Sequence, residues 1–106
     1  MKIFRLLLAG FGNVNRSLVK ILLSQADVLR ERHQLAFVVV GVADSSGAAA
    51  DPGGLPLEAL LASKRAGRSV GELPGLGRPG VTALALAREI DYDVLMEATP
   101  VNLKTA

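Results

Sequence analysis

The segment LLLAGFGNVNRSLV, from Leu6 to Val19, contains the transition on which the predicted fold depends. Two glycines, Gly10 and Gly12, interrupt its apolar run, although glycine inside a strand weakens that strand. The residues before them, Lys2–Ala9, are apolar almost throughout, which is typical of a strand buried on both faces of a parallel sheet. From Asn13 the apolar residues follow helical spacing instead. The two glycines therefore lie at a junction of strand, turn and helix.

The rest of the chain continues to alternate strands and helices. The first helix is predicted to end near residues 32–34, and the segment after it, LAFVVVGVA, is β-branched and apolar, so it predicts a second central strand. The order of elements predicts an α/β, Rossmann-like three-layer fold with a parallel sheet, right-handed βαβ crossovers and the spatial order second–first–third strand. The predicted segments after the first helix are a strand at Leu35–Ala43, a turn at Asp44–Gly47, a helix at Pro56–Arg65, a loop at Gly67–Gly80, a helix at Val81–Glu89 and a strand at Asp93–Ala98.

Length and composition narrow the class of protein. With 106 residues, the chain is one small domain or part of a larger protein, and 50% of its residues are hydrophobic. The net charge of +2 comes without any block of like charges, which argues against a nucleic-acid partner. There is no cysteine and one histidine, so no metal site is expected. The apolar run before Gly10 is too short to span a membrane, so we expect a cytoplasmic protein without a membrane partner. An exposed sheet edge would allow a homo-oligomer.

The turn Gly10-Phe-Gly12-Asn-Val-Asn15 falls where a nucleotide-binding turn is expected. The dinucleotide fingerprint is Gly-x-Gly-x-x-Gly. In it, Gly10 would allow the tight turn and Gly12 would let a pyrophosphate approach the backbone, next to the N–H groups that open the helix. Asn15 replaces the third glycine, so we expect a wider gap between helix and strand or a side chain turned toward the loop. The alternative is a turn that serves only to reverse the chain.

Polar residues at the ends of the other strands are candidates for the same site. Asp44, at the end of the second strand, would accept hydrogen bonds from the adenine ribose and so favour NAD over NADP; alternatively it bonds its own backbone within a turn. Ser45 and Lys64 are candidates for holding a 2′-phosphate. Thr99, which precedes Pro100 after the third strand, either faces the nicotinamide or only ends the strand.

The segments GFGNVNRSLV, VVGVADSSG and DVLMEATPVNLKT together resemble the amino-terminal part of homoserine dehydrogenase. The resemblance covers nearly the whole chain and is most specific in the last segment. It implies NAD(P)-dependent interconversion of L-homoserine and L-aspartate 4-semialdehyde, with residues 1–106 as the dinucleotide-binding domain. It also implies that the substrate and catalytic domain lies outside this chain, which would then hold no catalytic residue and be inactive alone. The residues that the resemblance places at the cofactor are Gly10, Phe11, Gly12, Asn13, Val14, Thr99 and Pro100.

Two other functions use a similar turn. A non-catalytic module that senses NAD(H) would bind the same dinucleotide and report its presence to a partner. A methyltransferase would hold S-adenosylmethionine in a comparable crevice, but the Thr-Pro-x-Asn segment that follows the third strand argues against this function.

Overall fold

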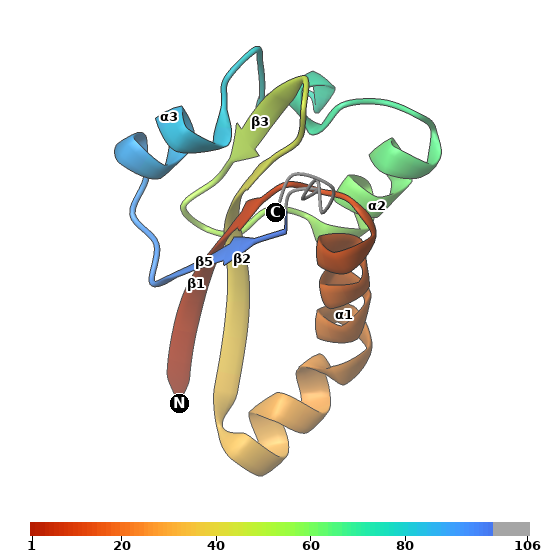
Figure 1. The fold of residues 1–106 in the computed structure, drawn as a ribbon. Helices are drawn as coiled ribbons and strands as arrows, with labels where there is room; N and C mark the ends of the chain where they lie inside the picture. The colour runs from red at the N-terminus through yellow and green to blue at the C-terminus, as the bar shows by residue number, and fades with distance from the viewer. Residues whose placement is uncertain (99–106) are drawn as a thin grey trace, which may run out of the picture.

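Two neighbouring parallel strands, β1 (Lys2–Ala9) and β2 (Leu35–Ala43), form the centre of the sheet and are joined by the long helix α1 (Asn13–His33). The computed structural model describes residues 1–98 (Figure 1). In it, β5 (Val94–Glu97) runs parallel to β1 on the side opposite β2. The predicted order second–first–third strand is therefore confirmed, as are the bounds of the first two strands and the first helix.

The sheet is larger than predicted and mixed rather than purely parallel. Its five strands lie in the order β4-β3-β2-β1-β5, with β3 antiparallel to β2 and β4 antiparallel to β3. The prediction of a loop over residues 67–80 was wrong, because this segment contains a short 3₁₀ helix and an edge strand. The elements not yet given are β3 (Gly47–Ala50), α2 (Leu57–Arg65), the 3₁₀ helix η1 (Val70–Glu72), β4 (Gly77–Pro79) and α3 (Ala83–Glu89).

Small residues let the extra strands pack closely against η1. The sequence of β3 is GAAA, whose residues have low strand propensity, and β4 is GRP. A Cβ atom on Gly77 would lie 2.2 Å from the backbone oxygen of Gly71, and a Cβ on Gly47 would lie 3.0 Å from the Cα of Gly71. The backbone-to-backbone contact of β3, β4 and η1 therefore depends on glycine at these three positions.

The core has two parts, one on each face of the sheet. The larger part joins Leu6 and Leu8 of β1 to Val19 of α1 and Leu60 of α2, and the smaller joins Leu7 of β1 to Leu86 of α3. Burying each such leucine contributes on the order of 2 kcal/mol. The helices α1 and α2 thus cover one face and α3 the other, which is the expected three-layer arrangement (Figure 1).

One irregularity sets the faces of β2. Leu6 pairs with Val39 but Leu7 pairs with Gly41, so Val40 is an extra residue that forms a β-bulge. Because of this extra residue, the side chains of β2 after the bulge lie on the same face of the sheet as the β1 side chains with which they pair. Gly41 lies under α3, where a Cβ atom would come 2.5 Å from the Ile90 side chain.

Among residues 1–98, no helix is both long enough and apolar enough to span a bilayer.

Candidate functional site

A cavity of about 310 Å³ lies where the parallel strands end. Because β1, β2 and β5 run parallel, their carboxyl ends meet at one edge of the sheet, which is where open α/β sheets bind ligands. Three strand ends, one residue of α2 and one of α3 line the cavity. The lining residues are Gly10, Phe11, Gly12, Ala43, Asp44, Ser45, Lys64, Ala83 and Ala98.

The two glycines of the turn differ in whether their backbone conformation requires glycine. Gly10 has φ 93°, in the left-handed region that favours glycine, so the chain reversal itself needs it. Gly12 is the N-cap of α1 with φ −88° and ψ −157°, a conformation open to any residue. A Cβ on Gly12 would have no atom within 4 Å among the described residues. Neither backbone strain nor packing within the described chain therefore explains the glycine at position 12.

Asn15 stands at the position of the third fingerprint glycine and its side chain is turned toward the loop, one of the two outcomes expected from the sequence. The residue is 1% exposed, and its Nδ2 donates hydrogen bonds to the backbone oxygens of Gly10, at 2.7 Å, and Met96, at 3.2 Å. This single amide thus connects the turn after β1, the first turn of α1 and the end of β5. Asn15 fixes the shape of the turn that borders the cavity.

The first turn of α1 begins beside the cavity, directly after the lining residue Gly12. A helix leaves its first N–H groups without partners inside the helix, and they carry the positive end of the helix dipole. The N-cap Gly12 has no side chain to accept from them. This end of α1 therefore offers donors to an anion at the cavity wall.

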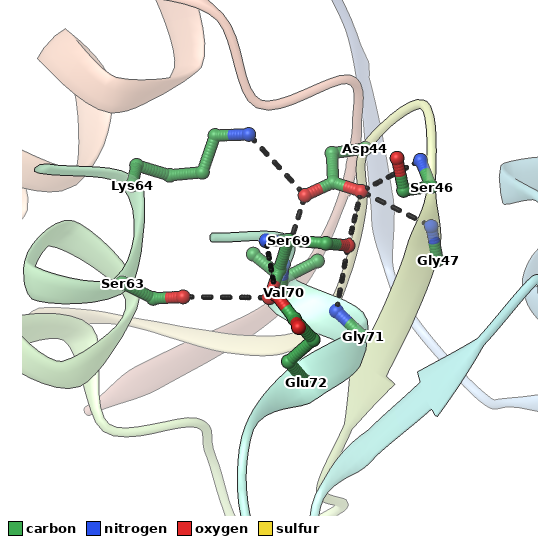
Figure 2. A network of polar contacts seen from close by, with 9 residues as sticks. All are labelled: Asp44, Ser46, Gly47, Ser63, Lys64, Ser69, Val70, Gly71 and Glu72. Carbon is green, nitrogen blue, oxygen red and sulfur yellow. Dashed lines mark hydrogen bonds and ion pairs between the residues drawn. The ribbon is translucent and has the colours of Figure 1, made fainter. Parts of the chain in front are cut away.

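The Asp44 side chain lies at the centre of a polar network (Figure 2). Its Oδ1 accepts hydrogen bonds from the backbone N–H groups of Ser46 and Gly47, as in the turn alternative of the sequence analysis, and from Ser69 Oγ at 2.7 Å. Its Oδ2 accepts from the Val70 N–H at 2.8 Å and forms an ion pair with Lys64 Nζ at 3.3 Å. The network joins the end of β2 to α2 and η1.

The same network sets the charge state of Asp44. Burial alone raises the pKa of this carboxyl, but hydrogen bonds from Val70, Ser69 and Ser46 and the charge of Lys64 outweigh burial, so the pKa lies below its ordinary value of 3.8. Asp44 is therefore ionised at neutral pH.

We expect acid to weaken the fold through Asp44. A carboxyl whose pKa is lower in the folded state stabilises the fold above its unfolded pKa, and this contribution is lost as the pH falls through the folded value. The free energy of unfolding, measured by urea titration, should thus fall as the pH is lowered below about 4. Asp44→Asn should flatten this dependence. Asp93, an exposed carboxyl whose pKa is also lowered, by its hydrogen bonds from Arg5, is the comparison, and Asp93→Asn should flatten the dependence less. An unchanged pH dependence in Asp44→Asn would contradict the role of Asp44.

The structure brings six of the ten predicted site residues together in the cavity wall. They are Gly10, Phe11, Gly12, Asp44, Ser45 and Lys64. Phe11 is only 3% exposed and also belongs to the core. Asn13 and Val14 lie outside the lining; Val14 is 69% exposed, and Asn13 accepts a hydrogen bond from Arg16. Thr99 and Pro100 fall outside the described residues.

Sequence reasoning did not identify two groups of site residues. Ala43, Ala83 and Ala98 line the cavity, but alanine carries no chemical signal. Ser69 and Val70, which bond Asp44, had a readable signal, because Ser69-Val-Gly-Glu72 has the Ser-x-x-Glu spacing of a capping box and the structure forms that box. No group of three or more His, Asp or Glu side chains gathers as a metal site within residues 1–98.

Comparison with known proteins gives two matches and one negative result. The chain is 34% identical over 100 residues to the homoserine dehydrogenase of Methanocaldococcus jannaschii, covering 94% of this chain and 29% of that protein. A crystal structure from Archaeoglobus fulgidus, assigned as a homoserine dehydrogenase, matches with a TM-score of 0.68 and 25% identity over 91% of this chain and 28% of that one. No family model matches.

The chain thus spans less than a third of the length of either protein. Within that span, the agreement in sequence and in fold confirms the resemblance stated from the sequence: over nearly all of its residues the chain is similar to the corresponding part of homoserine dehydrogenases.

Proposed function

We propose that the cavity at the ends of β1, β2 and β5 binds a nicotinamide dinucleotide, NAD or NADP, with its pyrophosphate against the first turn of α1. The observation that carries this proposal is the open space at Gly12, whose Cβ would meet no described atom within 4 Å and whose φ needs no glycine. A ligand that packs against the bare backbone gives this glycine a role beyond its preference for the N-cap position. The N–H groups at the start of α1, which have no partner within the helix, suit an anionic ligand.

The other lining residues would contact either the adenosine half or the nicotinamide half of such a ligand. Ser45 and Lys64, after β2 and on α2, would contact the adenosine half, and the cation of Lys64 would attract its phosphates. Ala98, after β5, lies toward the end of the sheet where the nicotinamide half would sit.

We further propose that this cofactor site serves an oxidoreductase that interconverts L-homoserine and L-aspartate 4-semialdehyde. The likeness to two homoserine dehydrogenases supports this reaction. The bound dinucleotide would supply or accept the hydride. The residues of this chain would bind the cofactor and orient it, while the substrate contacts and the catalytic groups would come from a further part of a longer protein. In this reading residues 1–106 are the dinucleotide-binding domain.

Isothermal titration calorimetry tests the binding proposal directly. NAD, NADP and S-adenosylmethionine are titrated separately into the folded chain. We expect one dinucleotide site per chain, displaced by ADP-ribose because the pyrophosphate is the shared anchor, and no heat from S-adenosylmethionine. Binding of S-adenosylmethionine in place of both dinucleotides would assign the cavity to a different class of enzyme.

A further inference from the structure

We propose that Asp44 is a positioning residue that holds the Lys64 ammonium at the cavity, and that it does not accept hydrogen bonds from the ribose of the cofactor. The proposal rests on the dinucleotide site proposed above. It differs from the usual role of an acidic residue at the end of the second strand of a dinucleotide-binding fold, which is to bind the ribose hydroxyls.

The Asp44 carboxylate has no acceptor position left for a ligand. An ionised carboxylate offers about four lone-pair sites. The structure directs five donors to Asp44: the N–H groups of Ser46, Gly47 and Val70, the hydroxyl of Ser69 and the amine of Lys64. A ribose diol would therefore have to displace a donor that the protein already supplies.

Burial also separates the Asp44 carboxylate from a ligand in the cavity. The Asp44 side chain is only 5% exposed, although the residue borders the cavity. The donors around it come from its own turn, from α2 and from η1 with its N-cap, so the carboxylate is enclosed by protein groups (Figure 2). Opening the network for a ligand would leave a buried N–H or hydroxyl without an acceptor, which is costly.

Lys64 is the member of the network that is available to a ligand in the cavity. Its side chain is 24% exposed and reaches from α2 across to Asp44 Oδ2, and the residue lines the cavity. An ammonium group has three donors, and the described contacts of Lys64 include a single hydrogen bond, to Asp44. Asp44 thus restrains a long, otherwise mobile cation at the cavity rim and leaves donors for an anionic or polar ligand.

The unmodified chain provides the first test, by NMR with ¹⁵N- and ¹³C-labelled protein. Without ligand, the Lys64 ammonium should give a distinct, slowly exchanging signal, because it is paired with a buried carboxylate. A Lys64 signal that coincides with those of exposed lysines would overturn the proposal. When NAD or NADP is added, the Lys64 signal should move while the ¹³Cγ signal of Asp44 stays in place. A large shift of the Asp44 carboxyl signal upon binding would instead make Asp44 a ligand of the ribose.

The second test is the variant Asp44→Asn. Asparagine keeps the size of the side chain and an Oδ1 acceptor, but an NH₂ group in place of Oδ2 faces the donors of Val70 and Lys64. The Lys64 signal should then become that of a free lysine. In the folded variant the affinities for NAD and NADP should fall by a similar factor, about tenfold, the scale of one hydrogen bond to a charged group. A loss confined to NAD would assign Asp44 to the ribose and overturn the proposal.

A double-mutant cycle separates positioning from a merely structural role. Lys64→Met should lower dinucleotide affinity by about tenfold in the unmodified chain but by less than about twofold in the Asp44→Asn background, because the amine is no longer held there. Equal effects of Lys64→Met in both backgrounds would show that Asp44 does not act through Lys64. If no dinucleotide binds the unmodified chain, the proposed function fails, and the ligand-free Lys64 signals still decide whether Asp44 holds the amine.

Discussion

Gly12→Val is expected to lower the affinity for NAD and NADP by at least about a hundredfold, the equivalent of about 2.8 kcal/mol. The branched side chain would enter the open space beside the first turn of α1 and separate the pyrophosphate from the backbone N–H groups. The protein itself should still fold, because a Cβ at this position meets no described atom within 4 Å and φ is −88°. Valine is a poorer N-cap than glycine, which should cost up to about 1 kcal/mol of stability.

Calorimetry of the variant with both dinucleotides, alongside thermal unfolding, separates these two effects. Gly53→Val is the matched control, because Gly53 is exposed, lies outside the cavity lining, and its Cβ would meet only the Asp51 carboxylate at 3.5 Å. The control should bind dinucleotide as the unmodified chain does. Undiminished affinity in folded Gly12→Val would remove the pyrophosphate from this turn.

Asn15→Gly is expected to destabilise the protein by about 3 kcal/mol, although it restores the third glycine of the dinucleotide pattern. The side chain is buried and donates to the backbone oxygens of Gly10 and Met96, so its removal leaves two acceptors without their donor. Glycine also lowers the propensity of this turn to be helical. The free energy of unfolding, from urea titration, measures the total.

Ser17→Gly, at an exposed position of the same helix, isolates the propensity effect and should cost only about 0.5 kcal/mol. The difference between the two variants then reports the hydrogen bonds of Asn15. Equal losses would mean that these bonds contribute nothing to stability. The comparison also shows why a departure from the fingerprint need not be a defect, since the amide performs a connecting role that glycine cannot.

The central part of the fold follows from hydrophobic patterning. Each of these segments has a pattern that predicts a single type of element: the apolar runs predict the strands β1 and β2, and the helical spacing predicts α1. The structure agrees with the predicted bounds within a residue or two. The strand ends then bring Gly10, Gly12, Asp44 and Ser45 to one cavity, because parallel strands share an edge. In long segments with a regular hydrophobic period, the type of element can be predicted from the residues of the segment alone.

The peripheral part did not follow, because its strands depend on tertiary contacts. The residues of β3, GAAA, have no intrinsic preference for a strand, and they form one because small side chains fit between β2 and the backbone of η1. The glycines and prolines of residues 67–80 suggest a loop, whereas here glycine permits close approach of Gly71 and Gly77. The partners of Asp44 were hidden for the same reason, since Val70 reaches it only after η1 has docked.

The bulge at Val40 has a consequence for how β2 tolerates changes in length. Leu6 pairs with Val39 and Leu7 with Gly41, so the chain already accommodates one surplus residue between two regular pairs. Loss of Val40 would leave every later partner in place, and Asp44 would still reach α2. Loss of Val42 would keep Asp44 in place only if the bulge were used up and Gly41 took the position opposite Leu8, which removes a buried valine from the larger core. The spare residue therefore protects the position of the carboxylate against a deletion in this part of the strand, and the cost of that deletion is set by which side chain the core loses.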